Sequence, residues 1–301
     1  MRAIVTGGAG FIGSHVAEAL LARGDEVHVV DDLSSGRREN VPDGAALHEL
    51  DIRREALTEL AAELQPDALF HLAAQADVGT SVERPELDAD INVVGTIRVL
   101  EAARPVGARV AFASTGGAIY GECERPAREE DERRPLSPYG TSKLAGEEYL
   151  ATWNRLYGTS HVVCRLANVY GPRQRPSLEG GVVTIFLLWL RDGRDAEIFG
   201  DGNQTRDFVY VGDVAEAMLA AASASGGGVF NVGSGTETSV LELYRMCAET
   251  AGVEQQPQHA PERPGDLRHS VLDPSRAARE LGWQAGTALA DGLARTWESM
   301  Q

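Results

Sequence analysis

Tyr139 and Lys143 stand four positions apart in the chain, a spacing that suits proton transfer. Residues four apart lie on one face of a helix, so we expect the phenol and the ammonium to face the same space. Free tyrosine, with a pKa of ~10, is a poor base at neutral pH, and a neighbouring ammonium lowers that pKa. The pair is therefore a candidate general base for an alcohol. An exposed tyrosine beside a lysine that only extends its stem along the surface has the same spacing. The neighbouring motifs therefore have to distinguish a catalytic pair from a surface pair.

Two hydroxyl side chains, Ser114 and Thr115, precede this pair at the expected end of a strand, within Ala113–Gly121. A hydroxyl there can hold a reacting oxygen while charge builds on it. The alternative is that both side chains only bind backbone groups where the strand ends.

A glycine-rich turn opens the chain. Gly7, Gly10 and Gly13 follow the apolar run Ala3–Thr6 at a GxxGxxG spacing. Glycines permit a tight turn and the approach of a pyrophosphate, which free N–H groups at a helix start then bind. The next apolar run ends in Asp31-Asp32, where a carboxylate binds ribose hydroxyls and repels a 2′-phosphate. The pattern predicts a dinucleotide site that favours NAD over NADP, with Arg37 and Arg38 in a solvated turn nearby.

Short β-branched runs alternate with longer amphipathic segments over the first half of the chain, which is typical of βαβ units. The expected strands are Ala3–Thr6, Glu26–Val30, Ala45–Glu49, Ala68–Leu72, Arg109–Ala113 and His161–Leu166. The expected helices are Gly10–Arg23, Arg54–Leu64, Asp88–Ala103 and Ser142–Tyr157, with a buried helix over Val182–Leu190. These elements predict an α/β fold with a Rossmann-like, doubly wound parallel sheet.

After about Val169 the alternation of expected strands and helices becomes irregular, and the expected loops are longer. We expect residues 1–168, joined by 208–223, to form the dinucleotide-binding domain. Residues 169–207 and 224–301 are expected to form a smaller, interleaved α/β domain that binds the substrate.

The net charge of −17 over 301 residues argues against nucleic-acid and anionic-membrane partners, both of which require positive surfaces. No apolar run approaches the ~20 residues needed to span a bilayer, and Met1 leads almost directly into a strand, leaving no room for a signal peptide. The three cysteines are far apart and form no CxxC pair, so we expect no structural zinc, no disulfide framework and a reducing cytoplasm.

A series of motifs in order along the chain resembles the extended short-chain dehydrogenase/reductases, and most closely the bacterial UDP-galactose 4-epimerases. The motifs are TGGAGFIGSH at Thr6–His15, DDLSSG at Asp31–Gly36, HLAAQ at His71–Gln75, SPYGTSKLAGE at Ser137–Glu147, RLANVYGPRQRP at Arg165–Pro176, QTRDFVYVGDVA at Gln204–Ala215 and RPGDLRHSVLD at Arg263–Asp273. The resemblance covers nearly the whole chain.

The resemblance implies that Tyr139 is the base, that Lys143 is its partner, and that NAD is a tightly bound prosthetic group. The cofactor contacts that it implies are Gly7, Gly10, Phe11, Ile12, Gly13, Asp31, Asp32, Ser35, Gly36, Asp51, Ile52, Leu72, Ala73, Ala74, Gln75, Asn92, Tyr139 and Lys143. The implied UDP-sugar contacts are Thr115, Asn168, Arg175, Gly181, Val182, Ile198, Phe199, Arg206, Arg263 and Asp266. Arg206 and Arg263 would bind the diphosphate and supply the local positive charge that the acidic chain lacks.

One position departs from the family. Many of these epimerases carry Ser or Thr where this chain has Gly116, so we assign the catalytic hydroxyl to Thr115, with Ser114 as the alternative. Related dehydratases and decarboxylases carry acids at the places of Gly117 and Ala118, and their absence favours 4-epimerisation.

The sugar and the assembly are left with alternatives. UDP-glucose and UDP-galactose are the first choice, and UDP-glucuronate is the runner-up, because Arg175 could bind a C6 carboxylate. A less favoured hypothesis is that the chain is a nucleotide-4-ketosugar reductase. In the family, the helices expected at Asp88–Ala103 and Ser142–Tyr157 pair with a second subunit in a four-helix bundle, and a homodimer is expected on that basis; burial of their apolar stripes within the monomer is the alternative.

Overall fold

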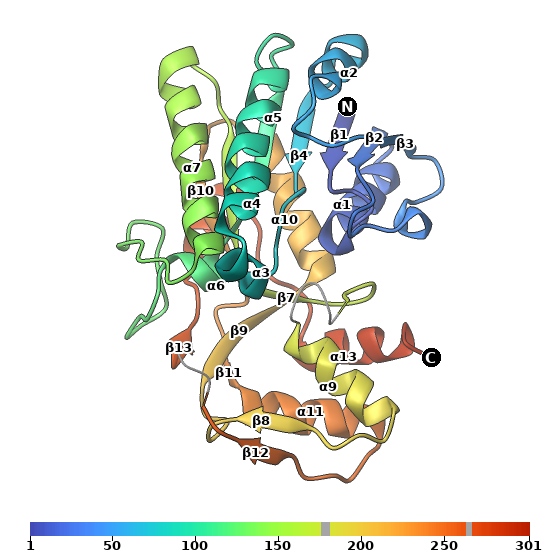
Figure 1. Ribbon diagram of the computed structural model, residues 1–301, viewed down its shortest axis with the longest axis vertical. Helices are drawn as coiled ribbons and strands as arrows, with labels where there is room; N and C mark the ends of the chain where they lie inside the picture. The colour runs from blue at the N-terminus through green and yellow to red at the C-terminus, as the bar shows by residue number, and fades with distance from the viewer. Residues whose placement is uncertain (176–180, 263–266) are drawn as a thin grey trace.

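A computed structural model describes residues 1–175, 181–262 and 267–301 of the protein (Figure 1). Its largest sheet has seven parallel strands in the order β10-β6-β5-β4-β1-β2-β3. The strands are β1 (Arg2–Thr6), β2 (Glu26–Asp31), β3 (Ala46–Glu49), β4 (Ala68–His71), β5 (Arg109–Thr115), β6 (Val162–Leu166) and β10 (Gly228–Val232). The strand order reverses between β1 and β4, so the carboxyl ends of these strands flank the crevice where doubly wound sheets bind ligands.

Helices cover both faces of this sheet. The covering helices are α1 (Phe11–Ala22), α2 (Ala56–Leu64), α5 (Gly95–Ala103), α7 (Pro138–Tyr157) and α10 (Val211–Ser223). The same part of the chain also contains α3 (Val78–Glu83), α4 (Pro85–Ala89), the π-helix η2 (Asp90–Val94), α6 (Gly116–Ile119) and the 3-10 turn η1 at Arg38–Asn40. Side chains of α1 and α10 share one core cluster, whereas those of α2, α5 and α7 share the other.

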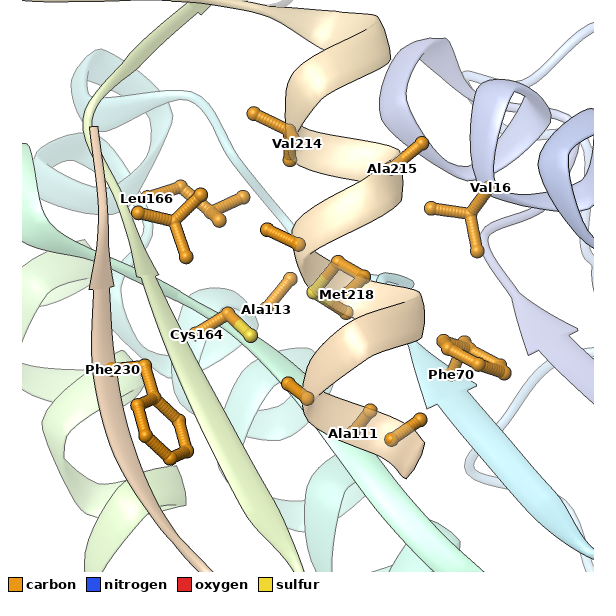
Figure 2. Close-up of a cluster of buried hydrophobic side chains, with 14 of the residues drawn as sticks. Val16, Phe70, Ala111, Ala113, Cys164, Leu166, Val214, Ala215, Met218 and Phe230 are labelled. Atoms are coloured by element: carbon orange, nitrogen blue, oxygen red, sulfur yellow. The ribbon is translucent and has the colours of Figure 1, made fainter. Parts of the chain in front are cut away.

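Strand residues alternate between these two cores. Ala3 and Val5 face the α1 and α10 side, whereas Ile4 between them faces the opposite side. Successive side chains of a strand point to opposite faces, so a strand covered on both faces needs an unbroken apolar run. Figure 2 shows the α10 side, where Val214 and Met218 approach the strands of the sheet.

The rest of the chain forms smaller sheets around a third core cluster. One sheet contains β7 (Asn168–Tyr170), β9 (Thr205–Tyr210), β11 (Glu237–Ser239) and β13 (His269–Ser270); the other pairs β8 (Glu197–Phe199) with β12 (Gln258–Ala260). The accompanying helices are α9 (Val182–Arg191), α11 (Val240–Ala251) and α13 (Leu289–Glu298), whereas α12 (Ser275–Leu281) packs on the large sheet beside β10 and α10. Among the described residues, no helix is both long enough and apolar enough to cross a bilayer.

The predicted parallel sheet is confirmed, and its strands lie within two residues of their expected bounds. Two helices differ. The helix expected over Asp88–Ala103 is α4, η2 and α5 in series, interrupted by a π-helical turn. The helix expected from Ser142 begins at Pro138, because the Ser137 hydroxyl accepts the Gly140 N–H at 3.1 Å and caps it.

One boundary requires correction. Residues 224–301 were expected to belong wholly to the smaller domain, but Gly228–Val232 pairs in parallel with β6 and extends the large sheet by one strand. The β-branched and aromatic residues of this strand complete the core beside Trp283. The remaining division into two domains stays a prediction.

Candidate active site

A cavity of about 1110 Å³ opens at the carboxyl ends of β1, β2, β4 and β5 and extends to β8 and α9. It gathers most of the residues that the sequence proposes for cofactor and substrate. Those that line it are Gly7, Gly10, Phe11, Ile12, Gly13, Asp31, Asp32, Ser35, Asp51, Ile52, Leu72, Ala73, Ala74, Gln75, Ser114, Thr115, Tyr139, Lys143, Asn168, Gly181, Val182, Ile198, Phe199 and Arg206. Segments far apart in the chain therefore share one site.

The glycine turn leaves room for a ligand because side chains cannot occupy it. Gly7 has φ +71°, and a Cβ there would lie 2.6 Å from the Ala73 nitrogen. A Cβ on Gly13 would lie 2.1 Å from the Gly7 carbonyl oxygen. Gly10 precedes the first turn of α1, whose free N–H groups open onto the cavity. This cradle fits the pyrophosphate of a dinucleotide.

Asp31 at the end of β2 suits the ribose. Its carboxylate is 7% exposed and accepts the N–H groups of Ala9 and Leu33, each at 2.9 Å through a different oxygen. Each oxygen keeps a lone pair for a ribose hydroxyl. Burial raises the pKa of this carboxyl, and the two N–H groups oppose that effect. Gly36 lies behind the carboxylate rather than in the cavity wall, since a Cβ there would approach its Oδ1 to 2.7 Å.

The arginines near the ribose position are engaged elsewhere. Arg37 pairs with Glu39 at 3.4 Å, and Arg38 pairs with Glu49 at 2.6 Å, all four side chains being largely exposed. Neither guanidinium lines the cavity. The site therefore presents carboxylates at the ribose end, which favours NAD over NADP.

The proposed base and its partner face the cavity from the first turns of α7. Lys143 is buried; its Nζ donates to the Ala113 carbonyl at 2.9 Å and lies 4.8 Å from the centroid of the Phe112 ring. Burial lowers the pKa of Lys143 to about 8. An ammonium held at this place stabilises the phenolate form of Tyr139, which is the form that removes a proton.

The two candidate hydroxyls have different surroundings. Ser114 donates to Glu147 Oε1 at 2.6 Å, and that carboxylate forms a buried ion pair with Arg165 at 2.6 Å. Thr115 also lines the cavity, and within the described part of the chain its hydroxyl makes no hydrogen bond. Only Thr115 thus has an uncommitted hydroxyl for a ligand oxygen.

Asn92 does not line the cavity, although it was expected to contact the cofactor. Its buried amide lies behind Gln75, accepting the Gln75 N–H and donating to the Gln75 carbonyl, both at 2.9 Å. It also donates to Ser142 Oγ at 3.1 Å. These bonds fix the loop after β4, which lines the cavity.

The opposite end of the cavity combines apolar walls with polar groups. Asn168 reaches the Asp207 carbonyl at 3.3 Å, and Arg206 donates to the carbonyls of Thr205 and Leu267 at 2.8 Å. Arg263 and Asp266, expected to bind the nucleotide, lie outside the described residues.

Arg175 is placed differently from the prediction. Its Nη1 donates to the Ser35 carbonyl at 3.1 Å, on the dinucleotide side, and it does not line the cavity. The sequence proposed that it could bind a sugar carboxylate, and this position does not support that role.

Several lining residues were missed, Gln174 and Arg53 among them. Gln174 donates to the Val169 carbonyl at 3.0 Å and accepts from Thr184, and Arg53 binds Asp51 at 2.6 Å. Gln174 stands inside the motif Arg165–Pro176, and Arg53 directly follows the predicted contacts Asp51 and Ile52. That proximity was the available signal.

Comparisons with known proteins agree with this site. The model of the NAD dependent epimerase/dehydratase family matches residues 3–233. UDP-glucose 4-epimerase of Mycolicibacterium smegmatis is 48% identical over 99% of this chain and 98% of its own length. A crystal structure of UDP-glucose 4-epimerase with UDP-glucose from Thermotoga maritima has a TM-score of 0.97 at 44% identity, covering 100% of this chain and 98% of that one. The Thermus thermophilus UDP-glucose 4-epimerase in complex with NAD has a TM-score of 0.93 at 44% identity, covering 99% and 98%.

Proposed function

The chain belongs to the NAD-dependent epimerase/dehydratase family, and we propose that within it this protein is an isomerase that interconverts UDP-glucose and UDP-galactose. NAD is its cofactor. The reaction inverts the configuration at C4 of the sugar through a transient 4-keto sugar.

The chain's own residues account for the proton transfers. Tyr139, as phenolate, takes the proton of the C4 hydroxyl, and the Lys143 ammonium stabilises that phenolate. Thr115 donates a hydrogen bond to the C4 oxygen while its charge changes. NAD held by the glycine turn and Asp31 would supply the group that accepts the C4 hydride and gives it back, so no net oxidation would occur. The keto sugar turns over in the cavity, and Tyr139 returns the proton to the C4 oxygen.

One observation favours epimerisation over elimination or decarboxylation. Gly117 and Ala118 line the cavity beside Thr115, and neither position carries a carboxyl group. A dehydratase needs an acid and a base for its second step, in addition to the Tyr–Lys pair that serves the first oxidation at C4. Epimerisation has no second step of that kind and needs no further acid or base.

The direct test is to incubate the purified protein with UDP-glucose and measure UDP-galactose. Interconversion without consumption of added NAD is expected, and Tyr139→Phe should abolish it while NAD stays bound. A dehydrated or decarboxylated product, or unchanged turnover by Tyr139→Phe, contradicts the proposal. A reductase would lose its nicotinamide on desalting, whereas the epimerase should retain it.

The runner-up substrate pair is UDP-glucuronate and UDP-galacturonate. Because Arg175 binds the Ser35 carbonyl on the dinucleotide side, the structure offers it no role at the sugar. Arg175→Ala should therefore leave the ratio of UDP-glucose to UDP-glucuronate turnover unchanged. If Arg175→Ala selectively lost turnover of UDP-glucuronate, the uronate pair would again be a candidate substrate.

The assembly and compartment are further parts of the proposal. We propose a homodimer formed through η2, α5 and α7, where Val94, Tyr149, Leu156 and Tyr157 are exposed apolar or aromatic side chains. Helices α5 and α7 lie side by side in Figure 1, and η2 contacts both of them. The three cysteines are free thiols, which fits a reducing cytoplasm.

A further inference from the structure

A buried carboxylate lies behind the catalytic helix, and it forms no ion pair with the described residues. Asp88, in α4, is 1% exposed, and within the described residues no arginine, lysine or histidine forms an ion pair with it. It does not line the large cavity but borders a separate hollow of about 550 Å³ between α4 and the start of α7. A buried charge without a partner is costly, so its position calls for an explanation.

The Asp88 carboxylate is the hub of a polar network. Its Oδ1 accepts from Asn92 Nδ2 at 3.0 Å and from Gln75 Nε2 at 3.1 Å. Asn92 stands in the π-helix η2, a widened helical turn of the kind that is frequent at functional sites. The same Asn92 amide donates to Ser142 Oγ at 3.1 Å, and Ser142 Oγ donates to the Tyr139 carbonyl at 3.0 Å. The network therefore joins the loop after β4, which lines the cofactor side of the cavity, to the turn that carries the base.

Charge provides a second line of argument. Among the described residues, His71 of β4, Asp88 of α4 and Glu147 of α7 act electrostatically on Lys143, and Tyr139 of α7 lines the same cavity. His71 is neutral, because burial lowers its pKa to about 3. Glu147 is already paired with a guanidinium, that of Arg165. Asp88 is left as the unpaired negative charge, and it opposes the effect of burial on the pKa of Lys143.

We propose that Asp88 is a positioning residue for proton transfer. It fixes the positions of Asn92 and Gln75 relative to the start of α7, and it keeps a negative charge behind Lys143. The inference rests on the proposed epimerisation. Asp88 touches neither substrate nor cofactor and acts through Asn92, Ser142 and Lys143. The chemistry that it supports is the retention of the ammonium that makes the Tyr139 phenol acidic.

Asp88→Asn tests the charge, with Glu86→Gln as the matched control on an exposed acid of the same helix. We expect kcat for UDP-glucose to fall on the order of tenfold. The alkaline limb of the kcat profile should move to lower pH by on the order of one unit, because the ammonium loses its stabilising charge. KM should stay within about twofold, since Asp88 is absent from the cavity wall. The control should behave as wild type.

Ser142→Ala tests the positioning role separately from the charge. It removes the hydrogen bond that joins Asn92 to α7 and leaves the Asp88 charge in place. It should lower kcat several-fold with the alkaline limb unmoved. The proposal is overturned if the alkaline limb of the kcat profile of Asp88→Asn stays at the wild-type pH, or if Ser142→Ala keeps the wild-type kcat. Either outcome counts even if thermal unfolding shows that the variant is less stable.

Failure of this inference is distinguishable from failure of the proposed function. The near-ultraviolet phenolate absorbance of each protein, minus that of its Tyr139→Phe counterpart, follows the titration of the catalytic pair without turnover. If wild type does not interconvert the two sugars, the function is wrong, and the phenolate titration of Asp88→Asn still decides the role of Asp88.

Discussion

Leu272 fills the space that a side chain at Gly116 would need: a Cβ at position 116 would lie 2.4 Å from Leu272 Cδ1 and 3.1 Å from its Cγ. Leu272 is 2% exposed and belongs to the core beside α10, so it has little room to move away. Glycine at position 116 and leucine at position 272 are therefore matched. A hydroxyl side chain does not fit at position 116, so the catalytic hydroxyl that we propose comes from a neighbouring residue.

Thr115→Val should show that Thr115 is that neighbour. The change keeps the shape and removes the hydroxyl, so we expect kcat to fall on the order of 100-fold, as it does when one donor to a developing oxyanion is lost. Ser114→Ala is the comparison, because its hydroxyl already serves Glu147. It should lower the melting temperature and change kcat by no more than about threefold. The opposite ranking of the two variants would assign the hydroxyl to Ser114.

The pH dependence of turnover follows from Lys143. Burial lowers the pKa of this ammonium to about 8, so it loses its proton as the pH rises through that value. The Tyr139 phenolate then loses its stabilising charge, and kcat should decline on the alkaline side. Lys143→Met removes the charge at every pH, so its activity should be low and lack that alkaline limb. Measurements of kcat at saturating UDP-glucose on both sides of pH 8 give the comparison.

Much of this site could be predicted from the sequence, because local patterns determine it. The GxxGxxG turn depends on backbone geometry within a few residues, and the Tyr139/Lys143 pair depends on helical spacing. Asp31 ends an apolar strand, and its place in a doubly wound sheet follows from the topology. For these residues, short-range rules and the order of the elements are sufficient.

Other positions depend on contacts between distant segments, which a single sequence does not show. Arg175 reaches Ser35 across 140 positions of the chain, and Gly228–Val232 joins the large sheet beside β6. Asn92 is in a motif that the resemblance identified, yet its amide binds Gln75 and Ser142 because of a π-helical turn that amphipathic periodicity does not predict. The fit between Gly116 and Leu272 is likewise a packing fact of the folded chain.

The buried ion pair of Glu147 and Arg165 should be sensitive to the loss of one partner. Both side chains are 3% exposed or less, and they are joined by bonds of 2.6 to 3.2 Å. Glu147→Gln leaves a guanidinium buried without its carboxylate, so we expect the free energy of unfolding to fall by about 3–5 kcal/mol. Replacement of both partners by Leu and Met should cost less than the single change. Chemical denaturation measures this, and a double variant that is less stable than the single one would contradict the argument.

Cofactor retention should depend on Asp31. Asp31→Ala removes the acceptor for ribose hydroxyls and also releases the N–H groups of Ala9 and Leu33, so the NAD cradle loosens. We expect NAD that survives desalting of the wild type to be lost from the variant, with affinity reduced on the order of 10- to 100-fold. Arg38→Ala is the control, because its guanidinium pairs with Glu49 outside the cavity. Cofactor content measured after desalting is the readout, and NAD retained equally by both variants would place the ribose elsewhere.

The proposed dimer surface can be tested at Leu156. This side chain is 64% exposed near the end of α7. On the same helix the rings of Tyr149, Trp153 and Tyr157 pack edge to face, with centroids 5.7–5.8 Å apart. Buried apolar contact drives association, and a carboxylate in such an interface has to lose its water without gaining a partner. Leu156→Glu should therefore shift the protein from dimer to monomer in sedimentation at micromolar concentration. Leu136→Glu is the matched control, because Leu136 is 69% exposed but lies in the loop before α7. If Leu156→Glu sediments as wild type does, α7 does not form the interface near Leu156, and its apolar face is simply exposed to solvent there.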